Sequence, residues 1–231
     1  MGKFSLHIEH FKRDQVHALE VHHMRRGKTH SNSEIKTELS SNNVVLIAPK
    51  KSVFQDIKSD IETKIQGRVT KASVWVSELV MTLPQEIPIS SSKEYFADCL
   101  EFLQGEFQDD CIKLAVIHMD ETTPHLHCMV EPRTSDNKLS RKEIFTRSYI
   151  QKLHTAMPKY LASKGWNIEP PKASEHGDYR KSIKELKEET RKLAKLNHAL
   201  REDSKAMIEA NYTKVCKIYE RYKKLHKEIS R

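Results

Sequence analysis

Apolar residues along this chain follow two different periods, one typical of strands and one typical of helices. Alternation of apolar with polar residues, and short apolar runs, predict strands at residues 4–8, 44–48, 72–83, 112–118 and 125–130. Apolar residues three and four apart predict helices at residues 53–66, 91–107 and 146–163, the last with a bend at Pro158. Because helices follow strands singly and in pairs, the order favours an α+β domain over a doubly wound one.

Two polar segments interrupt this pattern. Residues 17–43 are rich in histidine and arginine and are expected to form a functional loop. Residues 165–171 contain Gly165 and end in two prolines, which indicates a linker. We therefore expect a first domain at residues 1–171 and a tail at residues 172–231.

The tail has the sequence of one long helix, without Gly or Pro from Asp178 to the last residue. Apolar residues recur every seven positions at Leu186, Leu193, Leu200 and Met207. The paired positions Thr190, Asn197 and Ser204 are polar, and the phase shifts after Met207. The pattern predicts an amphipathic helix and leaves open whether two copies pair through it.

The charge is concentrated in this tail. Residues 180–231 hold sixteen Lys and Arg against eight Asp and Glu, an excess equal to the net charge of +8 for the whole chain. A basic helix suits a polyanion such as nucleic acid, although a solvated helix face gives the same pattern. No apolar run approaches the roughly 18 residues of a membrane span, and the first residues lack the apolar core of a signal peptide, so we expect a cytoplasmic protein.

The candidate chemistry lies at the junction of the last two predicted strands. His118 ends one strand, and His125 and His127 project from one face of the next, so a tight turn would bring three imidazoles together. Three imidazoles suit a divalent metal and leave a coordination position open, which favours catalysis over scaffolding. Beside them, Glu121 is the candidate general base or further ligand, and Asp120 is the candidate structural carboxylate.

A second group of candidate catalytic residues lies earlier in the chain. His22 and Arg25 are three residues apart, so on one helical turn they would share a face. An arginine can hold a phosphate bidentately while a histidine attacks phosphorus, which favours phosphate chemistry.

These two segments resemble two motifs of a known protein family. His118-Met-Asp-Glu-Thr-Thr-Pro-His-Leu-His127 is similar to the third motif, HxDE(S/T)TPHxH, of the MOBV-type relaxases, the plasmid mobilisation and recombination (Pre/Mob) proteins. The family's first motif, HNxR followed by Ser-Asn, resembles His22-His23-Met24-Arg25 with Ser31-Asn32. His23 departs from the family's Asn, which leaves two adjacent histidines as candidates, with the spacing to Arg25 favouring His22.

The resemblance implies an HUH-type relaxase, with a central antiparallel sheet flanked by helices. Such an enzyme nicks single-stranded DNA at a plasmid or mobile-element transfer origin. The resemblance assigns the Mn or Mg ion to His118, His125 and His127, the attachment to the 5′ phosphate to His22, and the steadying of that phosphate to Arg25. The first tyrosine, Tyr95, stands too late for the N-terminal tyrosine nucleophile of many other relaxases.

The sequence also suggests which residues contact DNA, what the tail binds and which other functions the chain could have. Trp75 and Trp166 are candidates for base stacking or for the core, and phosphate contacts are expected from Lys138, Arg141, Lys142 and Arg147. The tail is expected to bind DNA, a second copy or the transfer machinery. Two other functions stay open: a three-histidine metallohydrolase that forms no covalent intermediate, and a non-catalytic DNA-binding homologue.

Overall fold

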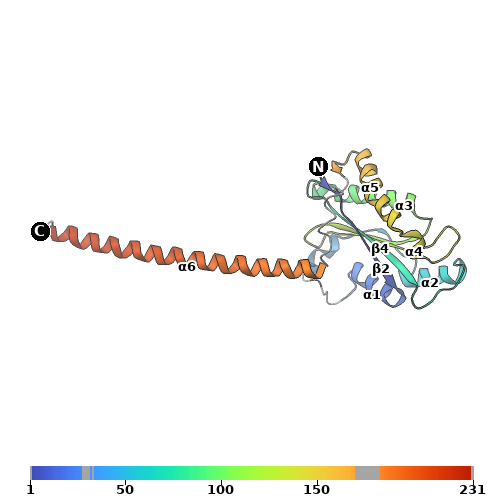
Figure 1. Cartoon of the computed structure of the whole chain (residues 1–231), viewed down its shortest axis with the longest axis horizontal. Coiled ribbons are helices and arrows are strands. Elements are labelled where there is room, and N and C mark those ends of the chain that lie inside the picture. The colour runs from blue at the N-terminus through green and yellow to red at the C-terminus, as the bar shows by residue number, and fades with distance from the viewer. Residues whose placement is uncertain (1, 28–31, 33, 170–182, 230–231) are drawn as a thin grey trace. The chain divides into compact units, whose positions relative to one another are not determined.

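The computed structural model describes residues 2–27, 32, 34–169 and 183–229, in two compact units at residues 1–171 and 172–231. The first unit is built on a five-stranded antiparallel sheet with the strand order β2-β4-β6-β5-β3 (Figure 1). Its strands are Leu6–Lys12 (β2), Val44–Ile47 (β3), Val74–Thr82 (β4), Ile112–His118 (β5) and His125–Val130 (β6). A separate parallel pair joins β1 (Gly2–Lys3) to β7 (Ile168–Glu169).

The sheet lies between two layers of helices (Figure 1). One face is covered by α1 (Arg13–His23) and α2 (Val53–Thr63), and the other by α3 (Ser92–Glu106) and α5 (Arg147–Ser163). Shorter helical turns are η1 (Thr37–Asn42), η2 (Ile89–Ser91) and α4 (Arg141–Ile144). The described part of the second unit is the helix α6 (Ile183–Ile229). The predicted fold class, an antiparallel sheet flanked by helices and followed by a long helix, is confirmed.

Strand alternation divides the core in two and decides which face receives the histidines. Leu114 of β5 and Met129 of β6 pack toward α1 and α2, while the adjacent Ala115 and Cys128 belong to the core under α3 and α5. His118, His125 and His127 lie an even number of residues from Leu114 or Met129 in the same strands, so they share the face of α1 and α2.

The expected loop at residues 17–43 is wrong over much of its length, because α1 extends to His23 and η1 covers Thr37–Asn42. The buried face of α1 consists of Val16, Glu20 and His23, at helical spacing. Two of these three residues are polar, so the helix has no apolar stripe to reveal it. Glu20 is tolerated there because its carboxylate accepts a hydrogen bond from the backbone N–H of Val53 at 2.9 Å.

Smaller differences concern element ends. The helix that begins at Val53 ends at Thr63, three residues before the predicted end. The helix α5 continues through Pro158. The expected linker at residues 165–171 contains the strand β7, and its two prolines lie outside the described residues.

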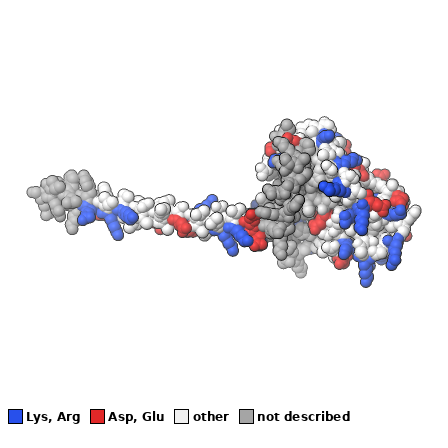
Figure 2. All heavy atoms as spheres, viewed as in Figure 1, with Lys and Arg blue, Asp and Glu red and all other residues white. Residues whose placement is uncertain are grey.

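Several apolar side chains of α6 are exposed among those that the structure describes. Leu193, Leu200 and Met207 are 56%, 55% and 71% exposed. Lys and Arg alternate with acidic and uncharged residues along the helix on the side that Figure 2 shows. None of the described helices is long and apolar enough to cross a membrane.

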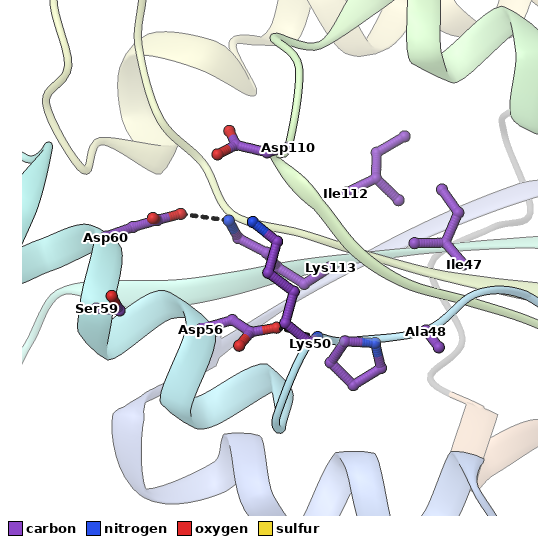
Figure 3. Close-up of a pocket in the computed structure, with 10 residues that line it drawn as sticks. Ile47, Ala48, Lys50, Asp56, Ser59, Asp60, Asp110, Ile112 and Lys113 are labelled. Atoms are coloured by element: carbon purple, nitrogen blue, oxygen red, sulfur yellow. Dashed lines mark hydrogen bonds and ion pairs between the residues drawn. The ribbon is translucent and has the colours of Figure 1, made fainter.

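A buried network of charges joins α2 to the sheet on the face of α1 and α2. Lys113 of β5 is 6% exposed, bonds the Asp60 carboxylate, as Figure 3 shows, and lies 3.1 Å from Glu131 Oε2. Burial raises the pKa of Glu131 to about 7. Lys113 is therefore the cation nearest to two buried carboxylates, which Arg133 also approaches, at 3.5 Å from Asp60 and 3.8 Å from Glu131.

We predict that Lys113→Met lowers the free energy of unfolding by about 3–5 kcal/mol, because it removes the cation nearest to the buried Glu131 and one of the cations around Asp60. Lys64→Met is the matched control, since Lys64 also pairs with Asp60 but its side chain is 40% exposed, and it should cost less than about 1 kcal/mol. Urea denaturation of both variants measures the difference. Equal losses would contradict the assignment of Lys113 as the central cation.

Candidate active site and metal centre

The β5–β6 hairpin brings three imidazoles together. His118 pairs directly with His125 across the two strands, and His127 lies opposite Val116. The ring centroid of His118 is 5.3 Å from that of His125 and 4.6 Å from that of His127, and the last two are 4.7 Å apart. Three nitrogen donors therefore converge on one side of the sheet.

Each of these three rings has one nitrogen bonded to an oxygen. The partners are the His23 carbonyl for His118 Nε2 at 2.8 Å, the Thr123 carbonyl for His125 Nδ1 at 2.8 Å, and Glu78 Oε1 for His127 Nδ1 at 2.7 Å. A carbonyl oxygen only accepts hydrogen bonds, so the nitrogen that faces it carries the proton. The opposite nitrogen of each ring then offers a lone pair, as metal-ligating histidines do. The donor set fits a divalent ion.

Burial keeps the imidazoles in the neutral form that binds metal. Desolvation, together with the neighbouring rings, lowers the pKa of His118 to about 2 and that of His127 to about 3. Burial opposes ionisation of Glu78, but the bond with His127 and the close approach of the His23 ring outweigh it and bring its pKa well below the usual value. Glu78 is therefore an ionised acceptor that orients His127.

Glu121 lies beside the histidines. Its Oε1 is 3.8 Å from His118 Nδ1 and 3.8 Å from His125 Nε2. These three side chains form one group whose ligand atoms lie within 4.8 Å of one another, and His23, His118 and His127 form a second such group. Glu121 is thus placed to share an ion with two of the three histidines.

The end of α1 brings a second set of residues to this site. Arg26 N–H donates to the Val21 carbonyl at 3.0 Å, and Arg25 N–H donates to the His22 carbonyl at 3.2 Å. These two bonds form a Schellman motif, which needs a left-handed residue after the helix cap. Arg25 occupies that position with φ 52°, where glycine is the usual residue.

The Arg25 side chain explains why an arginine stands there. Its guanidinium donates two 2.9 Å hydrogen bonds to the fully buried Asp120 and one of 2.6 Å to Glu121, and it contacts His118 Nδ1 at 3.1 Å. Burial opposes ionisation of Asp120, but the bonds from Arg25 and from Ser40 depress its pKa far below the usual range. Arg25 therefore ties the end of α1 to the turn after β5.

His22 and His23, the two adjacent histidines, have different surroundings. His23 is 2% exposed, and its Nε2 lies 2.5 Å from Glu78 Oε1. His22 is partly exposed, and its ring centroid is 5.4 Å from that of His23. Downstream, Asn32 donates to Glu121 Oε2 at 2.9 Å, whereas Ser31 lies outside the described residues.

Sequence reasoning missed Glu78 and Ser40. A signal existed for Glu78, because a carboxylate within the apolar strand Val74–Thr82 requires a buried partner. Of the two roles left open for the tryptophans, Trp75 takes the core role, because it is buried, and Trp166 packs against the other core and donates to Asp98 at 2.7 Å.

A histidine-bearing hairpin in the middle of an antiparallel sheet, between two helical layers, is the arrangement of the HUH-type relaxase domains that the two motifs resemble. The chain belongs to the Mob_Pre family, described as plasmid recombination enzyme, whose sequence profile matches residues 1–174.

Relatives and solved structures agree with this membership. The chain is 32% identical over 181 residues to a plasmid recombination enzyme of Bacillus thuringiensis, covering 76% of this chain and 41% of the relative. The corresponding enzyme of Lactiplantibacillus plantarum is 32% identical over 165 residues, covering 68% and 46%. The chain thus spans less than half of each relative. The MobM relaxase domain, in a Mn-bound crystal structure with plasmid pMV158 oriT DNA, shares the fold with a TM-score of 0.73 and 24% identity, covering 80% of this chain and 98% of that one.

We predict that Arg25→Ala and Arg25→Gly both destabilise the protein by about 3–5 kcal/mol, because Asp120 loses its buried counterion. The glycine variant should be the more stable of the two by about 1–2 kcal/mol, because the left-handed backbone at this position strains any residue with a Cβ. Urea denaturation of the two variants isolates the backbone effect. Equal stabilities would show that the Schellman geometry carries no strain.

Proposed function

We propose that this chain is a metal-dependent relaxase that nicks single-stranded DNA at a transfer origin and forms a covalent bond between His22 and the 5′ phosphate. The observation that carries the proposal is the convergence of three imidazoles, each oriented by an oxygen acceptor, within reach of α1. His23, the neighbour of His22, lies against His127 with ring centroids 4.0 Å apart. The proposed nucleophile is therefore adjacent in the chain to a residue that contacts a proposed metal ligand.

His118, His125 and His127 would hold the cation, and Glu121 is proposed as a further ligand because of its two 3.8 Å contacts. A divalent cation bound there supplies a Lewis acid that polarises the attacked phosphate. Imidazole nitrogens favour Mn over Mg. The Mn found in the structure of the MobM relaxase domain, which shares this fold, supports the same choice.

His22 is the proposed nucleophile because it is partly exposed, whereas His23 is buried against Glu78. A ring nitrogen of neutral His22 forms the bond to phosphorus while the bond from phosphorus to the 3′ oxygen breaks. The 3′ oxygen leaves as a hydroxyl group after taking a proton, and the imidazole loses its own proton to solvent. Energy is conserved in the phosphoramidate bond, so strand rejoining stays feasible.

Cations close to the site support a DNA substrate. The Arg26 side chain, just after α1, is 55% exposed, and the exposed Lys36 donates its backbone N–H to the Asp120 carbonyl at 2.8 Å. Lys and Arg side chains also lie on the surface of α1 and α2 (Figure 2). Such cations neutralise backbone phosphates and bind single strands without reading their sequence. Arg25 is proposed to steady the attacked phosphate only at the edge of its guanidinium, since Asp120 and Glu121 occupy its main donors.

We further propose that two copies pair through the exposed apolar face of α6. Leu193, Leu200 and Met207 repeat every seven residues, as in a coiled-coil seam. Asn197 lies in the paired series, where a buried asparagine lowers stability but restricts the register of pairing. The seam is expected to give a weak dimer.

The proposed nucleophile is tested by incubating the full chain with Mn²⁺ and single-stranded oligonucleotides that tile the DNA upstream of its gene. The wild type should form a covalent adduct, visible as a shifted band on a denaturing gel. His22→Ala should lose the adduct and retain metal binding by calorimetry, whereas His125→Ala should lose both. His17→Ala, an exposed histidine on the same helix, is the matched control and should behave as the wild type.

Two results would overturn this proposal. An adduct that persists in His22→Ala would place the nucleophile elsewhere. Cleaved strands with free ends and no attached protein would identify a metal-dependent hydrolase instead.

The pairing of α6 is tested by sedimentation of the full chain. Leu200→Glu should raise the dissociation constant of the dimer at least about tenfold, because it puts a charge into the apolar seam. Ala199→Glu changes the neighbouring position outside the seam and should leave the constant unchanged. A wild type that remains monomeric at all concentrations would refute the pairing.

A further inference from the structure

His23 is a buried imidazole to which the proposed reaction gives no role. It is the last residue of α1 and is 2% exposed. Its ring centroid lies 4.0 Å from that of His127 and 5.7 Å from that of His118. His23 therefore belongs to the same cluster of rings as two of the proposed metal ligands.

The nitrogens of His23 lack directed hydrogen bonds. Among the described residues, neither Nδ1 nor Nε2 has a hydrogen-bond partner, although Nε2 lies 2.5 Å from Glu78 Oε1. A buried polar atom without a hydrogen bond is costly, and such atoms are rare in folded proteins. With Nε2 facing Glu78, the lone pair of Nδ1 is the group that needs a partner.

A bound ion would provide that partner. His23, His118 and His127 each offer one ligand atom, and these atoms lie within 4.8 Å of one another. We propose that His23 is a fourth imidazole ligand of the metal centre, beside His118, His125 and His127. This inference rests on the proposed function, because it requires an ion at those three histidines.

A fourth imidazole changes which ions the centre prefers. Mg²⁺ prefers oxygen ligands, whereas Co²⁺, Ni²⁺ and Zn²⁺ gain more than Mn²⁺ from each added nitrogen. An ion with six coordination positions still keeps room for the phosphate of the substrate. The centre of this chain should therefore select Co²⁺ over Mn²⁺ more strongly than a three-histidine site does.

The other role open to His23 is to support Glu78, which in turn orients His127. Glu78 Oε1 faces both rings, at 2.5 Å from His23 Nε2 and 2.7 Å from His127 Nδ1. A supporting residue of this kind changes metal affinity but leaves the number of bound imidazoles unchanged. Counting the bound nitrogens separates the two roles.

The test compares the wild-type chain with His23→Gln, whose amide can still donate to Glu78 but is a poor metal ligand. His17→Gln, on the exposed side of α1, is the matched control, and His127→Gln removes one of the three ligands in the proposed function. Calorimetry with Co²⁺ and Mn²⁺ gives the affinities, and pulsed electron paramagnetic resonance of the Mn²⁺ complex counts the bound imidazoles. Circular dichroism checks folding, and His23→Asn replaces His23→Gln if the latter is unfolded.

A ligand role predicts that His23→Gln loses one bound imidazole and at least about tenfold in Co²⁺ affinity, with a smaller loss for Mn²⁺. An unchanged imidazole count in folded His23→Gln would overturn this inference and leave the proposed function intact. If His127→Gln binds both ions as the wild type does, the metal centre of the proposed function itself is wrong.

Discussion

The antiparallel register of β5 and β6 is the constraint on which the whole site depends. Pairing of His118 with His125, and of Val116 with His127, sets all three imidazoles on the face of α1 and α2. A shift of one residue would turn His125 and His127 into the apolar core under α3 and α5. The apolar residues of the same strands hold the register, since Leu114 and Met129 fill one core while Ala115 and Cys128 fill the other. Packing and chemistry are thus specified by the same alternation.

The second constraint is the bond network that holds α1 against this hairpin. Arg25 bridges the end of α1 to Asp120, and the carbonyl of His23 accepts a bond from His118. Both contacts join residues more than ninety positions apart in the chain. The helix end that carries the proposed nucleophile therefore cannot move without disturbing a proposed metal ligand. Such a shared network suits a site that must hold a phosphate and a cation at fixed separation.

Most of the sheet could be predicted from the sequence, because its strands are marked by apolar alternation or short apolar runs, two of which stop at Pro49 and Pro84. The helix α1 could not, since its buried face includes Glu20 and His23, whose partners come from Val53 and Glu78. The short strand β7 was hidden for a similar reason: two residues carry no period, and only pairing with β1 defines it. Local periodicity cannot predict elements whose buried residues are polar and have partners far away in the chain.

For the site, the sequence was enough to identify the family, the three histidines with the adjacent carboxylates, and their place at the ends of two neighbouring strands. These features are local, because a strand's period and a short motif need no distant contact. Tertiary structure alone decided that His23 is buried while His22 is partly exposed, that Glu78 orients His127, and that Arg25 is committed to Asp120. Those roles depend on contacts between residues of different strands and helices. Such contacts are set by tertiary packing and not by the spacing of residues along the chain.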